Sequence, residues 1–330
     1  MHNSSNKDTS AFCRNKRILI TGGGGYLAGS LLNLLEDVDC CVMRVGRSKE
    51  RFAVAGAPGR TEDVVGDVRE RDVWESVLDG VDMVFHFAGQ TSVYVANQDA
   101  QADLEANVVP MLHLLEMCRL KRANPIILFS GTATEVGIPV RLPVDETHPD
   151  NPVTVYDLHK LIAENYLKYY ATQGLVRGAT LRLANVYGPG PRSSSADRGV
   201  LNMMVRRALA REPITVYGHG EQLRDYIYTE DVARAFLSAA AAIEKTNGRH
   251  FVIGSGEGHT ILQAMSLIAK RVALKTGIQV PLVHVEPPQP QSSIEERNFV
   301  ADTSLFNGLT SWRARVPLAE GIDRTIEAAA

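Results

Sequence analysis

Short apolar runs rich in β-branched residues alternate with longer helical patterns from Arg17 to about Leu183. Strands joined through helices lie parallel, because the crossover returns the chain to the same end of the sheet. The predicted strands read RILIT, CCVMRV, DVVGD, DMVFHFA, PIILFSG and GATLRLAN, and the clearest predicted helices read YLAGSLLNLLE, ANVVPMLHLLEMCRL and YDLHKLIAENYLKYYATQ. We therefore expect an α/β fold with a doubly wound parallel sheet and helices on both faces.

The alternation loosens in the second part of the chain. A GPGPRSSSADRG loop, a predicted helix over residues 200–210, short strands and a proline-rich VEPPQPQSS follow one another there. We expect a disordered tail over residues 1–15, a main domain over residues 16–185 and a smaller C-terminal α/β lobe over residues 186–330. The boundary is soft, because the apolar run HFVIGS could form a further strand of the main sheet.

Charge and composition narrow the class of partner. A formal net charge of -3 does not indicate a nucleic-acid surface. No apolar run approaches the roughly 20 residues that span a bilayer, and the polar start MHNSSNKDTSAFCRNK has no signal-peptide core. We expect a cytoplasmic protein without a membrane partner, and the cysteine spacing predicts no metal site.

Glycines 22–25 separate the first predicted strand from the first predicted helix. Glycine in such a turn permits positive φ and lets backbone N–H groups approach a pyrophosphate at the helix N-terminus. The spacing Gly22-x-x-Gly25-x-x-Ala28 is a Rossmann-type dinucleotide pattern with alanine in third place. We expect Gly22 and Gly25, with Tyr26 and Leu27 at the helix start, to bind the cofactor. A plain flexible turn is the alternative.

The end of the second predicted strand bears on which dinucleotide binds. An NAD site usually has a carboxylate there for the ribose 2′-hydroxyl, but Gly46 stands in its place and Arg47 and Ser48 follow. An arginine fork and a hydroxyl suit a 2′-phosphate, so we expect NAD(P), with NADP favoured over NAD. A solvated basic loop is the alternative. Asp67 and Val68 end the third strand, where Asp67 would meet the adenine amino group unless it is only a turn residue.

Tyr156 and Lys160 are four residues apart at the start of a predicted helix, so their side chains share a face. An ammonium group beside a tyrosine favours the phenolate, which suits the tyrosine for acid–base catalysis near neutral pH. For this spacing alone, a structural pair is the alternative.

Taken in order, the motifs resemble the extended short-chain dehydrogenase/reductase family, in its nucleotide-sugar epimerase/dehydratase/ketoreductase branch. The resemblance covers residues 16–326 and rests on TGGGGYLAGS, GDV, HFAGQTSV, EANV, FSGTATEVG, YDLHK, LRLANVYGPG, ITVYGHGEQLRDYIYTEDVARA, ADTS and EGIDRTI. It implies a Rossmann-type NAD(P)-binding domain, a nucleotide-sugar-binding C-terminal lobe and a nucleotide-diphosphate sugar as substrate. It also implies a homodimer formed through the helix ending LLEMCRL and the helix that carries Tyr156.

The resemblance assigns roles to individual residues. Tyr156 matches the acid–base tyrosine, Lys160 the lysine that binds the nicotinamide ribose and tunes the tyrosine, and Thr132 the residue that hydrogen-bonds the reacting sugar oxygen. The remaining matches are Phe87, Ala88 and Gly89 at the nicotinamide end of the cofactor, Asn107 as a structural amide, and Asn185 and Arg224 at the substrate diphosphate. The alternative for Arg224 is an ion pair with a carboxylate such as Asp225.

Three reactions and one non-catalytic role remain to be compared. A 4,6-dehydratase has an Asp-Glu pair after the threonine, but Ala133 and Thr134 stand here, and neither can perform that elimination. TAT in this place resembles epimerases that pass through a transient keto sugar, most often at C4, and this is the function we expect. The alternative is an NADPH-dependent ketoreductase of nucleotide-linked 4-keto-6-deoxy sugars in deoxysugar biosynthesis, which the Gly46-Arg47 pair favours. A non-catalytic nucleotide-binding sensor would typically lack Tyr156 or Lys160.

Overall fold

The computed structural model describes residues 9–54, 60–191, 199–287 and 292–329. Its main sheet has seven strands in the order β10-β6-β5-β4-β1-β2-β3, and each neighbouring pair is parallel. The strands are β1 (Arg17–Thr21), β2 (Cys41–Gly46), β3 (Thr61–Val65), β4 (Met83–His86), β5 (Ile126–Thr132), β6 (Arg177–Leu183) and β10 (Arg249–Ile253). The predicted doubly wound parallel sheet is confirmed. The strand order reverses between β1 and β4, which places a ligand crevice at their carboxyl ends.

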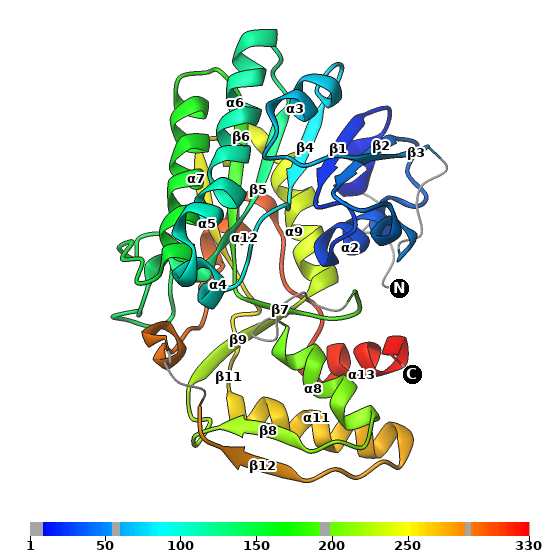
Figure 1. The fold of residues 1–330 in the computed structure, drawn as a ribbon, viewed down its shortest axis with the longest axis vertical. Helices are drawn as coiled ribbons and strands as arrows, with labels where there is room; N and C mark the ends of the chain where they lie inside the picture. Colours follow the sequence, from blue (N-terminus) through cyan, green and yellow to red (C-terminus); the bar gives the residue numbers. More distant parts are fainter. Residues whose placement is uncertain (1–8, 55–59, 192–198, 288–291, 330) are drawn as a thin grey trace.

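Helices cover both faces of this sheet (Figure 1). One face packs against α2 (Tyr26–Leu35) and α9 (Thr229–Ala241), and the other packs against α3 (Arg71–Val77), α6 (Val109–Lys121) and α7 (Val155–Thr172). The shorter elements are α4 (Val93–Gln98), α5 (Ala100–Asn107), α10 (Ile243–Thr246), α12 (Ser304–Thr310), η1 (Ala11–Cys13), η2 (Lys49–Val54), η3 (Ala133–Val136) and η4 (Ser293–Glu296).

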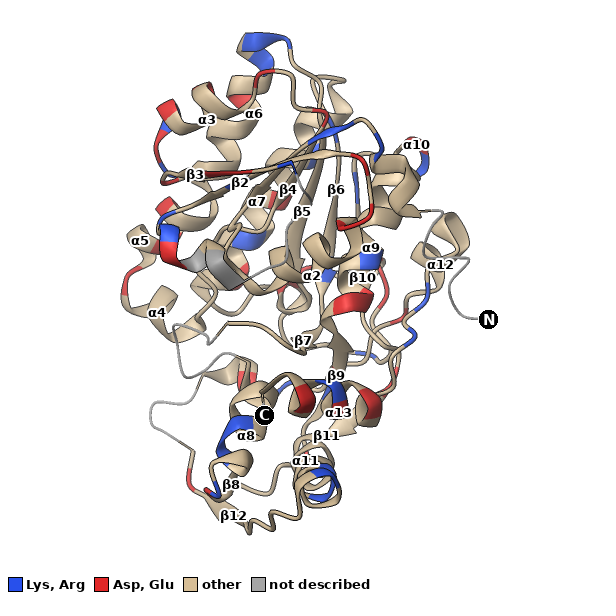
Figure 2. Ribbon diagram, turned by 90° about the vertical axis from the view of Figure 1, so that its right-hand side faces the viewer, with Lys and Arg blue, Asp and Glu red and all other residues tan. Residues whose placement is uncertain are grey.

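A smaller group of elements lies below the carboxyl ends of the main strands (Figure 1). It contains a three-stranded sheet of β11 (Gly258–Thr260), β9 (Leu223–Tyr228) and β7 (Asn185–Tyr187), and a parallel pair of β12 (Leu282–Val285) and β8 (Ile214–Tyr217). Helices α8 (Val200–Leu209), α11 (Ile261–Thr276) and α13 (Leu318–Ala329) enclose its own hydrophobic core. Acidic and basic residues are interspersed over both parts of the molecule (Figure 2).

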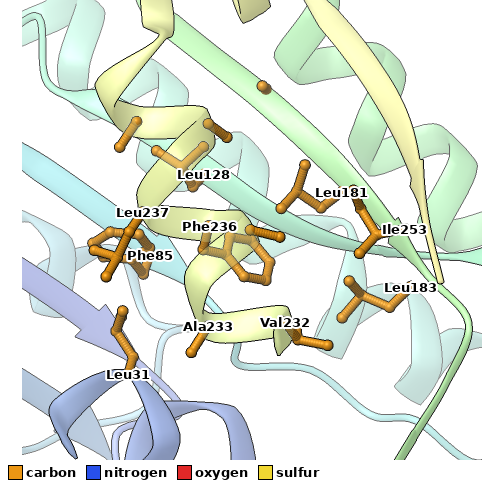
Figure 3. Packing of buried hydrophobic residues seen from close by; sticks show 14 of the residues in the cluster. Leu31, Phe85, Leu128, Leu181, Leu183, Val232, Ala233, Phe236, Leu237 and Ile253 are labelled. Atoms are coloured by element: carbon orange, nitrogen blue, oxygen red, sulfur yellow. The ribbon is translucent and has the colours of Figure 1, made fainter. Parts of the chain in front are cut away.

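Helix α9 joins the second half of the chain to the main core. Phe236 is fully buried on α9, and its ring lies 6.3 Å from the Phe85 ring of β4 and 4.8 Å from the Phe87 ring after it. Leu128, Leu181 and other strand residues complete this cluster (Figure 3). Because β10 pairs with β6, the main sheet and its core both depend on residues beyond 185.

Two local expectations need correction. The predicted helix ANVVPMLHLLEMCRL is divided, because α5 ends at Asn107 and α6 begins at Val109. Pro110 lies in the first turn of α6 and has no N–H to donate to the carbonyl four residues earlier, so the helical hydrogen bonds are interrupted there. The predicted tail over residues 1–15 is ordered at its end, where η1 holds Cys13 fully buried, while residues 1–8 lie outside the described part. Within the described residues, no helix has the length and apolar character needed to cross a membrane.

Candidate active site

The glycine turn lies between β1 and α2, as predicted. Gly22 has φ +67°, and a Cβ atom there would lie 2.9 Å from the Ala88 backbone nitrogen. A Cβ on Gly25 would lie 2.8 Å from the Gly22 carbonyl oxygen, and no side chain within the described residues caps the start of α2. The turn therefore leaves the N–H groups in the first turn of α2, a ten-residue helix, open to an anion. These features fit the pyrophosphate of a dinucleotide.

Side chains beside this turn also restrict its glycines. A Cβ on Gly23 would lie 2.5 Å from the Arg44 Cβ, so Gly23 is required for packing as well as for backbone freedom. The Tyr26 ring packs against Gly190, because a Cβ atom on Gly190 would lie 2.3 Å from that ring. Asn202 donates to the Tyr26 hydroxyl at 3.3 Å. Burial raises the pKa of Tyr26. Leu27 packs on the main core.

The end of β2 carries no carboxylate. The Phe52 ring fills the space into which a side chain at position 46 would project. A Cβ atom added to Gly46 would lie only 3.1 Å from this ring. Arg47 follows and is exposed, and the Ser48 hydroxyl donates to Glu50. A 2′-phosphate at this place would meet no acidic side chain of β2 itself.

Asp67 and Val68 follow β3, and both already have protein partners. The Asp67 carboxylate accepts from the Arg69 guanidinium at 2.7 and 3.0 Å, and this hydrogen bonding lowers the pKa of Asp67. The Val68 carbonyl accepts from the Trp74 indole at 2.8 Å. Contact of Asp67 with adenine stays a prediction.

The residues expected at the nicotinamide end follow β4. Thr21 accepts from the Ala88 backbone N–H at 3.1 Å, and the Phe87 ring packs edge-on against Phe236. A Cβ on Gly89 would lie 2.6 Å from Asn107 Oδ1, while Asn107 Nδ2 donates to the Gln90 carbonyl at 3.0 Å. Asn107 thus holds the backbone after β4, in keeping with the structural role expected of it.

Tyr156 and Lys160 lie in the first two turns of α7 and are 5% and 4% exposed. Tyr156 packs in a small apolar cluster with Val93 and Ala96 of α4 and Ile294 of η4. The Lys160 ammonium lies 4.0 Å from the centroid of the Phe129 ring on β5. Lys160 is therefore held against β5, and both side chains lie in surroundings that exclude water.

Thr132 ends β5 and is the N-cap of η3. Its hydroxyl lies 2.9 Å from the Thr134 hydroxyl, which donates to the Asp157 carboxylate at 2.5 Å. Asp157 is the neighbour of Tyr156 on α7 and is fully buried. The three residues thus connect the end of β5 with the start of α7.

A buried group of charged residues contacts the segment that begins at Thr132. Glu135 accepts from the Thr132 backbone N–H at 2.8 Å, and Arg182 on β6 contacts Glu135 at 2.9 Å and Glu164 on α7 at 2.7 Å. Burial and the Glu164 charge raise the pKa of Glu135, whereas Arg182 outweighs burial and lowers the pKa of Glu164. A neutral Glu135 beside an ionised Glu164 is the arrangement that this asymmetry favours.

The two residues expected to bind the substrate diphosphate lie on strands β7 and β9. Asn185 begins β7 and pairs with Tyr226 of β9. Arg224 on β9 is 4% exposed and donates to the carbonyls of Arg297 and, at 2.7 Å, Glu295. It does not pair with Asp225, but its guanidinium lies 3.7 Å from the Glu295 carboxylate, so the alternative of an ion pair with a carboxylate is met by Glu295. Diphosphate binding by Asn185 and Arg224 stays a prediction.

The structure therefore brings Thr132, Tyr156 and Lys160 to one edge of the sheet, beside the glycine turn. Sequence reasoning missed the supporting residues Thr134, Glu135 and Asp157. All three lie inside quoted motifs, and the threonine two positions after Thr132 was a signal that could have been used. Ile294 carried no signal, because its contact with Tyr156 joins segments 138 positions apart.

Comparison with known proteins shows which family and fold the chain shares. Residues 18–254 match the model of the NAD dependent epimerase/dehydratase family. The chain is 28% identical over 312 residues to a putative UDP-glucose 4-epimerase of Methanocaldococcus jannaschii, with 94% of this chain and 97% of that protein covered. It is 27% identical to the CDP-paratose 2-epimerase of Salmonella typhi, with 93% and 97% covered. The structure of UDP-glucose 4-epimerase with UDP-glucose from Thermotoga maritima superposes with a TM-score of 0.84 at 28% identity, covering 94% and 98% of the two chains.

His86 at the end of β4 makes stability depend on pH. Burial, helped by the Lys160 charge, lowers the pKa of His86 to about 3, against about 6.5 in an unfolded chain. Between these values the unfolded chain binds more protons, so the free energy of unfolding falls as the pH drops from about 6.5 towards 3. We expect His86→Asn to flatten this decline in urea titrations at several pH values. The exposed His219→Asn is the control and should keep the wild-type slope.

Proposed function

Because the chain belongs to the NAD dependent epimerase/dehydratase family, we propose that it is a nucleotide-sugar epimerase acting through a transient keto sugar at C4. The observation that carries this proposal is the convergence of Thr132, Tyr156 and Lys160 beside the glycine turn, with Ala133 and Thr134 after the threonine. An elimination needs proton-transferring side chains in those two places. Oxidation and re-reduction of one carbon do not need them.

The residues of this chain divide the work as follows. The Tyr156 phenolate takes the proton of the sugar hydroxyl and later returns it, and the Lys160 ammonium on the same helix face stabilises the phenolate. A nicotinamide dinucleotide held by the Gly22–Gly25 turn would supply the hydride acceptor and donor. The apolar packing of Tyr156 with Val93, Ala96 and Ile294 limits exchange of the proton with water. Support for a nucleotide-linked sugar comes from the relatives, which act on UDP-glucose and CDP-paratose by name.

A specific observation keeps the ketoreductase as second candidate. Gly46 lies under Phe52 and no carboxylate ends β2, while Arg47 is exposed beside it. This favours a 2′-phosphate, and a reductase that exchanges NADPH in each turnover would use such a site.

The state of the purified protein separates the two reactions. An epimerase re-uses its hydride, so we expect cofactor to co-purify and UDP-glucose or a related nucleotide sugar to be converted into its C4 epimer without added dinucleotide. The measurements are absorbance near 340 nm, analysis of acid-released cofactor, and NMR of the product. A protein that purifies empty and consumes NADPH with a nucleotide-linked 4-keto sugar would be the reductase instead.

Tyr156→Phe removes the proposed acid–base group and keeps the ring. We expect turnover to fall by about 10²- to 10⁴-fold, the usual contribution of one such group, while dinucleotide binding measured by calorimetry stays unchanged. The control is Tyr169→Phe on the same helix, where the side chain is 60% exposed. Turnover within a few-fold of wild type in Tyr156→Phe would rule out the proposed acid–base role.

Arg47→Ala tests the preference for NADP. Loss of a charge-assisted hydrogen bond to a 2′-phosphate should raise the dissociation constant of NADP by about 10- to 100-fold. The dissociation constant of NAD should rise by much less. The control is Arg60→Ala, which removes another exposed arginine, near β3. It should change the dissociation constant of neither dinucleotide. Equal weakening of both dinucleotides by Arg47→Ala would remove the 2′-phosphate role.

A further inference from the structure

The Lys160 ammonium lies over an aromatic ring at the edge of the proposed active site. Its Nζ atom is 4.0 Å from the centroid of the Phe129 ring on β5, and the negative face of an aromatic ring attracts a cation within about 6 Å. Lys160 is 4% exposed and Phe129 is fully buried, so little water competes for the ammonium group. The attraction between a ring face and a cation is strongest in such desolvated surroundings.

Burial by itself works against the charge that the proposed function requires of Lys160. Removal of an ammonium group from water favours the neutral amine, whereas stabilisation of the Tyr156 phenolate needs the cation. A ring face attracts the charged ammonium far more than the neutral amine, because the attraction acts between the cation and the ring quadrupole. Phe129 therefore offsets part of the desolvation cost and draws the charge towards β5.

The Phe129 ring is itself packed against other aromatic rings. His86 on β4 stacks with it at a centroid distance of 5.7 Å and an interplanar angle of 22°, and Trp74 meets His86 edge-on at 5.7 Å. Burial, helped by the Lys160 charge, lowers the pKa of His86 to about 3, so the His86 ring is neutral near pH 7. The stack thus fixes the Phe129 ring without placing a second positive charge beside the ammonium.

We propose that Phe129 is a positioning residue of the active site, whose ring face holds the Lys160 ammonium charged and in place beside Tyr156. Tyr156 and Lys160 share a face of α7, so an ammonium fixed over Phe129 keeps one position relative to the phenolate. Phe129 takes no part in the transfer of the proton or the hydride. The inference rests on the proposed function, in which this ammonium stabilises the Tyr156 phenolate.

Fluorination of the ring separates its charge distribution from its shape. Phenylalanines with one, two and three ring fluorines in place of Phe129 keep the shape nearly unchanged but make the ring face progressively less negative. We expect kcat to fall with each fluorine, by about 3- to 30-fold for the trifluoro ring, with KM for the nucleotide sugar within about threefold. Phe129→Leu, which has no ring, should lose at least as much. The same kcat in all the fluorinated proteins would overturn the proposal, because packing does not depend on the charge of the ring face.

Phe306 provides the matched control for this series. It is also fully buried, and it lies on α12 against the rings of Phe251 and Trp312. The same fluorinated phenylalanines at position 306 should leave kcat unchanged. An equal fall of kcat in both series would mean that fluorine perturbs the fold in general, and would remove the assigned role of Phe129.

A measurement without substrate tests the contact itself. In protein labelled with carbon-13 at the lysine Cε atoms, the Lys160 methylene protons should resonate upfield of those of the other lysines, because the ring face shields them. Lys160→Arg identifies the signal, and Phe129→Leu should return it to the range of the other lysines. A Lys160 signal that is unchanged in Phe129→Leu would overturn the proposal. If the wild-type protein converts no nucleotide sugar, the proposed function fails, and this comparison still decides whether the ring holds the ammonium.

Discussion

The buried ion pairs of Arg182 are the interaction on which the site geometry depends. Arg182 is 1% exposed, so its charge requires partners; it pairs with the carboxylates of Glu164 and Asp150 and also contacts Glu135, and the three come from different segments. A buried pair that loses one member typically costs about 3–5 kcal/mol. Through Glu135 this network holds the Thr132 backbone, and through Glu164 it holds the helix of Tyr156 and Lys160. The catalytic groups are therefore placed by charges that have no direct part in the proposed chemistry.

Close backbone approach is the second constraint. Gly22 meets the backbone after β4, Gly23 meets Arg44 on β2, and Gly89 meets Asn107 on α5. At each point a single Cβ would separate elements that must touch around the crevice between β1 and β4. The same absence of side chains leaves the start of α2 open, so packing and anion binding are served by one set of glycines.

Much of the fold could be predicted from local patterns. The strands RILIT and PIILFSG, the helix after the glycines and the helix of Tyr156 all lie where their hydrophobic periodicity put them, because each signal is contained in a few neighbouring residues. The division at Pro110 was missed, since the apolar pattern runs through it. The Cys13 turn was missed because its burial depends on contacts with distant strands.

For this protein, the sequence by itself determined the parallel sheet, the glycine turn at its first crossover and the shared face of Tyr156 and Lys160, because these follow from spacing along the chain. Only the tertiary structure decided that β10 and α9 complete the main core, that Phe52 fills the space over Gly46, and that Arg224 binds the carbonyls of Glu295 and Arg297. It also decided that Thr134 and Asp157 lie in line behind Thr132. Such contacts join residues that are far apart in sequence or on different elements, and only packing in three dimensions sets their distances.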